Sequence, residues 1–199
     1  MTGQVSVGEL ADWILAAPPR LGASRLVCID GPAGSGKTSL AAALARELAI
    51  RVGAVPVVQM DDLYEGWEQA LDVVPDVLRN RLLEPLSNGR SGRYQRYDWH
   101  AERFAEWHDV PAAPVVIVEG VGSAPRVAEP YLSLLVWIEA PADVRLARGI
   151  ARDGELLRPQ WERWMIHERQ HAERERTRER ADLILDGSSR PALGDAIGT

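Results

Sequence analysis

Short apolar runs alternate with helix-like segments along most of the 199-residue chain. Each run lacks charged residues and is rich in Val, Ile, Leu or Ala, which is typical of a buried strand. The pattern predicts strands over 26–29, 54–60, 115–118, 134–138 and 183–185.

Helical patterns separate these runs. Leu40, Leu44 and Leu48, for example, recur every four residues and form one apolar stripe. Helices are predicted over 7–16, 37–49, 67–86 (interrupted near Pro75), 142–151 and 159–180, with a turn-rich loop over 87–92. This alternation predicts an α/β fold, a doubly wound and mainly parallel five-stranded sheet with helices on both faces. The length suits a single domain over 1–199.

Composition narrows the class of protein. Hydrophobic residues make up 46% and charged residues 26%, as in a soluble globular protein. The net charge of −6 argues against a general nucleic-acid binder, and no apolar stretch is long enough to span a membrane. An N-terminal segment with acidic rather than basic residues does not resemble a signal peptide, so we expect the cytoplasm. We expect the protein to bind a small molecule and to bind neither nucleic acid nor a membrane. The sequence is compatible with a homo-oligomer. Cys28, Trp13 and Trp137 are predicted core residues.

Residues 29–41, IDGPAGSGKTSLA, contain the pattern G-x-x-x-x-G-K-[ST] between a predicted strand and a predicted helix. In such a P-loop the glycines let backbone N–H groups surround an anion, the lysine contacts the β- and γ-phosphates, and the hydroxyl reaches Mg²⁺. The start of the helix adds its dipole. We therefore predict a P-loop NTPase that uses ATP and Mg²⁺. The predicted ATP-binding residues are Gly31, Ala33, Gly34, Ser35, Gly36, Lys37, Thr38 and Ser39.

Lys37 is the only lysine in the chain, although Lys and Arg together number 23. A compact ammonium group is not interchangeable with a planar guanidinium in a tight phosphate cradle, so its place in the motif strengthens the prediction. The single lysine also rules out the N-K-x-D motif by which GTPases read guanine.

Acidic residues follow two predicted strands. Asp61 and Asp62 come after 54–60, and Glu119 comes after 115–118. Because parallel sheets bind ligands at the carboxyl ends of their strands, Glu119 is expected to help Thr38 hold Mg²⁺, directly or through water. One acid of the Asp pair can orient an acceptor hydroxyl and take its proton. A helix N-cap at Asp62 is the structural alternative.

Two helical segments carry many charges. Arg145, Arg148 and Arg152 fall on one helix face, where they can stabilise the charge on a transferring phosphoryl group or remain solvated. The run HERQHAERERTRER is predicted to be a solvated helix face. It contains His167 and His171, a spacing that can hold a metal ion, but the sequence suggests no third ligand.

The pieces GPAGSGKTSLA, DDLY, YDW (97–99), VVIVEG and RLARGIARD, in this order, resemble the uridine kinase-like group of P-loop kinases. This group includes uridine-cytidine, nicotinamide riboside and pantothenate kinases and phosphoribulokinase. The resemblance spans about 26–153, and ADLILDG resembles the final strand of the family. It implies a kinase domain with an acceptor-side insertion at about 61–110 and a short lid at about 152–160.

The resemblance also assigns roles to residues. It implies that Asp61 activates the acceptor, that Tyr64 is its aromatic companion, and that Tyr97 contacts a nucleoside. It places Glu119 at Mg²⁺, and it places Arg148 and Arg152 at the entry to the lid. A segment like FDHPDAFD is missing after the Asp motif, and the lid, DGELLRPQW, lacks a basic run, so the acceptor stays open.

The expected function is ATP-dependent phosphotransfer to a hydroxyl of a small, nucleoside-like metabolite. Lys37, Asp61, Arg148 and Arg152 are the predicted catalytic residues. The predicted acceptor-binding residues are Asp62, Tyr64, Trp67, Arg96, Tyr97, Asp98 and Trp99, because aromatic faces and carboxylates suit a ring joined to a polyol.

Three alternatives remain at this point. A nucleoside monophosphate kinase could grip its acceptor's phosphate with Arg90, Arg93 and Arg96. The chain could instead be a pantothenate or sugar kinase, or an ATP-binding regulator without catalysis.

Overall fold

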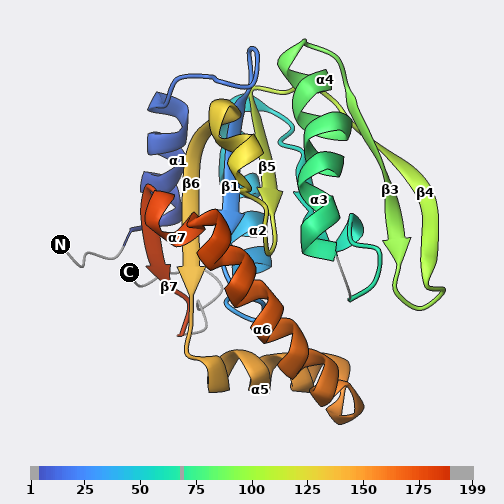
Figure 1. Cartoon of the computed structure of the whole chain (residues 1–199). Coiled ribbons are helices and arrows are strands. Elements are labelled where there is room, and N and C mark those ends of the chain that lie inside the picture. Colours follow the sequence, from blue (N-terminus) through green and yellow to red (C-terminus); the bar gives the residue numbers. More distant parts are fainter. Residues whose placement is uncertain (1–4, 68–69, 189–199) are drawn as a thin grey trace.

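The computed structural model describes residues 5–67 and 70–188, which Figure 1 shows as one sheet surrounded by helices. The sheet has five strands in the order β2-β5-β1-β6-β7, and every pairing is parallel. The strands are β1 (Arg25–Asp30), β2 (Val57–Gln59), β5 (Val115–Glu119), β6 (Leu132–Glu139) and β7 (Leu183–Asp186). The predicted α/β fold with a five-stranded parallel sheet is confirmed.

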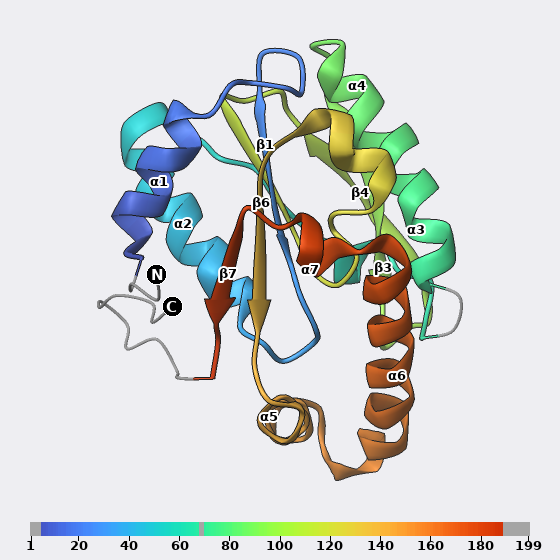
Figure 2. The same cartoon turned by 60° about the vertical axis from the view of Figure 1, so that its left-hand side comes forward.

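Helices cover both faces of this sheet (Figure 2). On one face lie α1 (Val7–Ala16) and α2 (Lys37–Val52), and on the other lie α3 (Ala70–Leu78), α4 (Glu84–Ser87), α6 (Arg158–Glu175) and α7 (Thr177–Arg180). Helix α5 (Ala142–Asp153) lies at the edge where the strands end (Figure 1). Short 3₁₀ helices lie between these elements: η1 (Met60–Asp62), η3 (Arg126–Tyr131) and η4 (Glu155–Leu157).

Alternate residues along the strands pack into two apolar cores, one on each face of the sheet. Cys28 of β1 packs in the core under α3 and α4, whereas its neighbours Val27 and Ile29 pack in the core under α1 and α2. Cys28 and Trp137 are buried, as predicted. The prediction for Trp13 is wrong, because α1 buries its other face and leaves this side chain 48% exposed.

A hairpin stands apart from the main sheet. Strands β3 (Gly92–Asp98) and β4 (Arg103–Val110) pair in antiparallel fashion on the outer side of α3 (Figure 1). The sequence pattern predicted no strands here, because most hairpin positions carry charged or polar side chains. Gly92 and Tyr94 are buried while Arg93 between them is exposed, so burial on one side explains the composition.

Two predicted helices differ from the observed ones. Pro75 lies inside α3 and does not interrupt it, although its missing N–H removes one helical hydrogen bond. The geometry changes further on, at the π-helical turn η2 (Arg79–Leu83). Helix α6 ends at Glu175, and Arg176, with a left-handed φ of 54°, separates it from α7.

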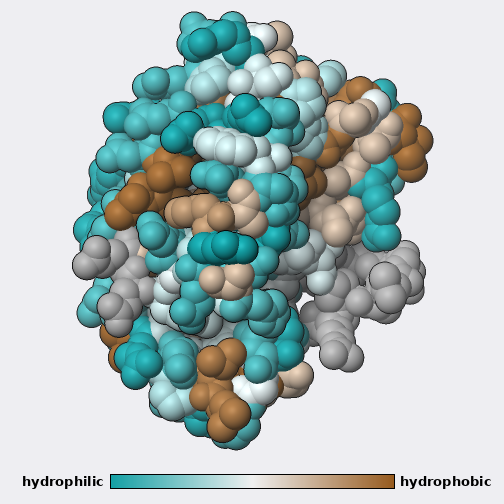
Figure 3. All heavy atoms as spheres, turned by 90° about the vertical axis from the view of Figure 1, so that its right-hand side faces the viewer, coloured by the Kyte–Doolittle hydropathy of each residue, from teal (hydrophilic) through white to brown (hydrophobic). Residues whose placement is uncertain are grey.

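The charged surface of α6 is only partly solvated. Glu168 and His171 lie within the run predicted to be exposed, yet they are 3% and 2% exposed. On the face shown in Figure 3, hydrophobic residues emerge in small separate areas among hydrophilic ones. Within 5–67 and 70–188, no helix combines the length and apolar character needed to cross a membrane.

Candidate active site

The P-loop joins β1 to α2 and lies against the neighbouring strand β6. Residues 31–36 form the loop, and Lys37, Thr38 and Ser39 open α2. Gly31 has φ 139°, and a Cβ there would lie only 2.0 Å from the carbonyl oxygen of Ile138. Gly34 has φ 77°, and a Cβ would lie 2.7 Å from the carbonyl oxygen of Arg145. The loop therefore requires glycine at both positions, for conformation and for close approach.

Asp30 holds the first residue of the P-loop in place, a role that the sequence analysis did not anticipate. Its carboxylate accepts hydrogen bonds from the N–H groups of Gly31 at 2.7 Å, Gly122 at 2.9 Å and Ala124 at 3.0 Å. It thereby joins the P-loop to the loop after β5. Burial raises the pKa of Asp30, while these N–H groups and Lys37 oppose the rise. An acid between an apolar strand and a P-loop is the signal that could have revealed it.

Lys37 and Thr38 lie at the centre of the site. The Lys37 Nζ donates to the carbonyl oxygen of Pro32 at 3.0 Å, and the Thr38 hydroxyl donates to Glu119 Oε1 at 2.9 Å. Burial raises the pKa of Glu119, and the positive charge of Lys37 opposes the rise. A hydroxyl and a carboxylate side by side next to a phosphate cradle are the oxygen ligands that Mg²⁺ prefers, so these residues fit the predicted ion.

Asp61 and Asp62 lie in η1, directly after β2. Asp61 is exposed to solvent, yet desolvation by the surrounding protein raises its pKa, and the charges of Lys37 and Arg152 oppose the rise. Asp62 accepts a hydrogen bond from the Tyr94 hydroxyl at 3.1 Å. The two acids therefore face different surroundings. Asp61 shares the electrostatic field of Lys37, whereas Asp62 is tied to the hairpin.

The aromatic residues predicted to bind the acceptor pack against one another. Trp67 lies edge-on to Trp99, with ring centroids 5.3 Å apart, and Tyr97 contacts Trp99 at the same distance. Tyr64 and Trp67 both contact Trp164 of α6, at 5.5 and 5.7 Å, a residue that the sequence analysis missed. Trp99 Nε1 also donates to the backbone carbonyl of Asp61 at 3.0 Å. This aromatic cluster therefore stabilises η1, the turn that contains Asp61.

Arg96 and Asp98 serve the hairpin in this structure. Arg96 pairs with Glu106 at 2.6 Å and with Asp98 at 3.4 Å. Asp98 also accepts the N–H groups of His100 and Ala101, which closes the turn between β3 and β4. Their predicted contact with an acceptor stays a prediction.

The three arginines of α5 have different surroundings. Arg145 is buried and pairs with Glu168 at 2.7 Å. Arg148 donates to the carbonyl oxygens of Gly34 at 3.1 Å, Gly187 at 2.8 Å and Ser188 at 2.8 Å. Arg152 is held by the adjacent Asp153 through two hydrogen bonds, and its charge acts on Asp61. Of the three, Arg152 is the one whose charge acts on Asp61, whereas Arg145 and Arg148 donate hydrogen bonds to carbonyl oxygens of the P-loop.

The two histidines of α6 differ in burial. His167 is exposed, whereas His171 is buried, its Nδ1 lies 3.3 Å from Arg174 Nη2, and burial lowers its pKa. In the ranges that the structure describes, no group of three or more His, Cys, Asp or Glu residues is arranged to hold a metal ion.

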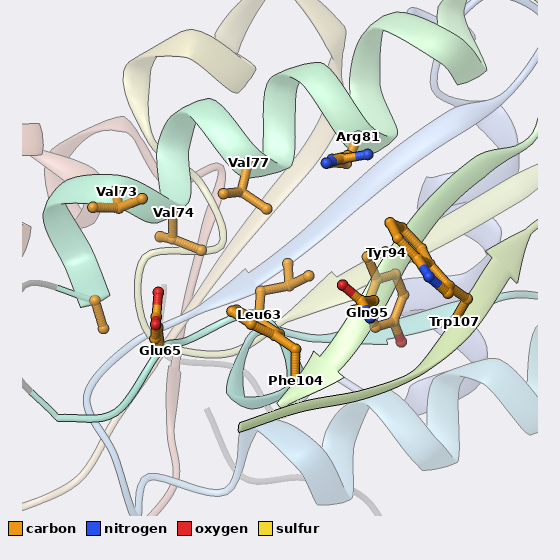
Figure 4. Close-up of a pocket in the computed structure, with 11 residues that line it drawn as sticks. Leu63, Glu65, Val73, Val74, Val77, Arg81, Tyr94, Gln95, Phe104 and Trp107 are labelled. Atoms are coloured by element: carbon orange, nitrogen blue, oxygen red, sulfur yellow. The ribbon is translucent and has the colours of Figure 1, made fainter. Parts of the chain in front are cut away.

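A groove of 670 Å³ separates α3 from the hairpin. In Figure 4, Val74 and Val77 of α3 lie across this groove from Leu63, Tyr94 and Trp107. Glu65, Gln95 and Arg81 add polar groups to the lining. Because Tyr94 also binds Asp62, the groove adjoins the acid pair, and its volume lies in the range of small-molecule sites.

Comparison with known proteins agrees with this architecture. No family model matches the chain. A possible uridine kinase from Bacillus stearothermophilus is 21% identical with a TM-score of 0.65, and the match covers 89% of this chain and 96% of that one. A proposed fructose transport system kinase from a Silicibacter species is 20% identical with a TM-score of 0.66, and the match covers 90% of this chain and 98% of that one. At such identities the similarity establishes the fold alone, a parallel α/β fold that this chain shares with both structures.

Proposed function

We propose that the protein is an ATP- and Mg²⁺-dependent kinase that phosphorylates a hydroxyl of a small, nucleoside-like metabolite. The observation that carries this proposal is the meeting of Lys37, the Thr38–Glu119 pair and Asp61 at the carboxyl ends of β1, β2 and β5. In parallel sheets this edge is where ligands bind. Phosphoryl transfer depends on a fixed cation, a metal-binding acid and an acid beside the acceptor, and Lys37, Glu119 and Asp61 are the candidates for these three parts.

Each residue has a defined part in the proposed reaction. Lys37 would hold the β- and γ-phosphates, and Thr38 and Glu119 would hold Mg²⁺, which would neutralise charge on the phosphates. Asp61 accepts the proton of the acceptor hydroxyl while that oxygen bonds to the γ-phosphorus and the bond to the leaving ADP oxygen breaks. The raised pKa of Asp61 makes it a stronger base than an ordinary aspartate. Arg152 is the candidate for stabilising the transferring phosphoryl group.

The arginines of the hairpin favour an alcohol without a phosphate as acceptor. Arg93 pairs with Asp109 at 3.3 Å, and Arg96 pairs with Glu106 at 2.6 Å. Their charges are therefore already matched by carboxylates on the opposite strand. This pairing supports a nucleoside-like acceptor over a nucleoside monophosphate.

The test is a panel of acceptors assayed for ADP release in the presence of ATP and Mg²⁺. The panel contains nucleosides, nucleoside monophosphates, pantothenate and simple sugars, with the Lys37→Ala variant as the inactive control. Turnover confined to nucleosides supports the proposal in full. Turnover confined to nucleoside monophosphates contradicts the proposed acceptor class. Turnover of pantothenate or a sugar alone supports kinase activity but contradicts a nucleoside-like acceptor. ATP binding without turnover of any acceptor favours the alternative that the protein is an ATP-binding regulator without catalytic activity.

A further inference from the structure

Glu168 is a buried carboxylate to which the proposed chemistry gives no role. It lies on α6, 135 residues beyond the P-loop, and is 3% exposed. Its Oε2 accepts the N–H of Ala33 at 2.7 Å, and its Oε1 accepts Arg145 Nη1, also at 2.7 Å. Burying a carboxylate is costly unless it is paired and hydrogen-bonded, and here each oxygen has its own partner.

One peptide unit links Glu168 to Lys37. The N–H of the Pro32–Ala33 peptide donates to Glu168, and the carbonyl of the same peptide accepts Lys37 Nζ at 3.0 Å. A trans peptide is planar, and its N–H and C=O point in opposite directions. Fixing the N–H toward α6 therefore fixes the direction of the carbonyl that holds the lysine.

Arg145 reinforces this arrangement from α5. Its Nη1 donates to the carbonyl oxygen of Ala33 at 3.2 Å as well as to Glu168, and its Nε donates to Ala140 at 3.0 Å. The absence of a side chain at Gly34 lets the loop pack against the Arg145 backbone. The two helices on either side of the short lid thus hold the first half of the P-loop through a buried ion pair.

We propose that Glu168 is a positioning residue that orients Lys37 through the Pro32–Ala33 peptide, and that α6 thereby sets the affinity of the site for nucleotide phosphates. The inference rests on the nucleotide-binding half of the proposed function and on neither the acceptor nor the phosphotransfer step. It also explains why an acidic residue is buried in the middle of a charged helix. If Glu168 only filled space, replacing it would change the stability of the protein but not the orientation of Lys37.

The first test separates positioning from stability. Replacing one member of a buried ion pair leaves the other charge unpaired, whereas replacing both with apolar residues is often neutral for folding. We therefore measure Mg²⁺-dependent binding of fluorescent methylanthraniloyl-ADP to the full-length Arg145→Leu/Glu168→Leu variant, together with its thermal unfolding. The matched control is Glu162→Gln, an exposed acid on the same helix. We expect the folded double variant to bind about tenfold more weakly, and the control to bind like wild type. Wild-type affinity in the folded double variant would overturn the proposal.

The second test asks whether Glu168 acts through Lys37. Glu168→Gln keeps a side-chain oxygen for Ala33 but presents an amide N–H₂ to Arg145, and we expect weaker binding in the wild-type background. In the Lys37→Ala background the same change should add little, because coupled residues give non-additive effects. If the two substitutions weaken binding by independent factors that simply multiply, Glu168 does not act through Lys37 and the proposal is overturned. If Lys37→Ala binds the nucleotide too weakly to measure, the Arg145→Leu/Glu168→Leu variant of the first test decides. A wild-type protein that binds no nucleotide would overturn both the site and this inference, whereas binding without phosphotransfer would overturn only the kinase.

Discussion

Glu119→Gln removes a charge from the predicted metal site and changes little else. Glu119 is 4% exposed and accepts the Thr38 hydroxyl at 2.9 Å, a hydrogen bond that a glutamine oxygen can keep. Losing a partner group of a bound metal ion typically costs about 10–100-fold in metal affinity or activity. We therefore expect the Mg²⁺ concentration for half-maximal ADP production to rise by about that factor. Nucleotide binding without metal should not change.

The same substitution has a predictable sign for stability. Burial raises the pKa of Glu119, so the folded state binds its proton more tightly than the unfolded state does. Such a group lowers the free energy of unfolding as pH rises from the unfolded pKa to the folded pKa, and this loss persists above it. Removing the charge at neutral pH without Mg²⁺ should leave the unfolding midpoint equal to or above that of wild type. A lower midpoint with unchanged Mg²⁺ dependence would refute the reasoning.

Glu139→Gln is the matched control, because Glu139 also ends a strand of the sheet. The hydrogen bond from Arg178 lowers its pKa, so its charge stabilises the fold above the unfolded pKa. This pair is largely exposed, and its loss should cost about 0.2–1 kcal/mol. The Mg²⁺ titration should match that of wild type.

The remaining predictions concern the catalytic step. Asp61→Asn should lower kcat by roughly 10²–10⁴ while ATP binding persists, and a larger loss for Asp62→Asn would reverse the assignment of the base. Arg152→Ala should mainly lower kcat, whereas Arg148→Ala should mainly raise KM for ATP because Arg148 holds the carbonyl of Gly34; the same pattern in both variants would contradict this division. The acidic limb of the profile of kcat/KM against pH should lie above the ordinary aspartate range, because desolvation raises the pKa of Asp61; a limb within that range would contradict this role for Asp61.

The sequence was most informative where structure depends on neighbouring residues. The P-loop and its two flanking elements could be predicted because the glycine spacing, the apolar run and the leucine stripe of α2 are all local signals. The three central strands β1, β5 and β6 could be predicted because their apolar runs are buried on both faces. The position of Glu119 beside the P-loop could be predicted because the carboxyl ends of parallel strands meet at one edge.

Features that depend on distant contacts could not be predicted in this way. Glu168 lies in a run of mixed charges that is typical of a solvated face, and its contacts with the distant residues Ala33 and Arg145 explain its burial. Nothing in the spacing of Arg148 distinguishes a phosphate ligand from a residue that holds Gly34. The hairpin was missed because it is covered on one side only, so its polar residues hide the strand pattern.

The most direct test of the central claim follows the γ-phosphoryl group itself. Purified protein is incubated with Mg²⁺, ATP labelled with ¹⁸O in the γ-phosphoryl group and a mixture of small metabolites, and the products are analysed by mass spectrometry beside Lys37→Ala. The proposed function predicts a labelled phosphate ester of one small alcohol, formed in equal amount with ADP and absent with the variant. Labelled inorganic phosphate as the only product, or equal products from wild type and Lys37→Ala, would contradict the claim that this protein is a kinase.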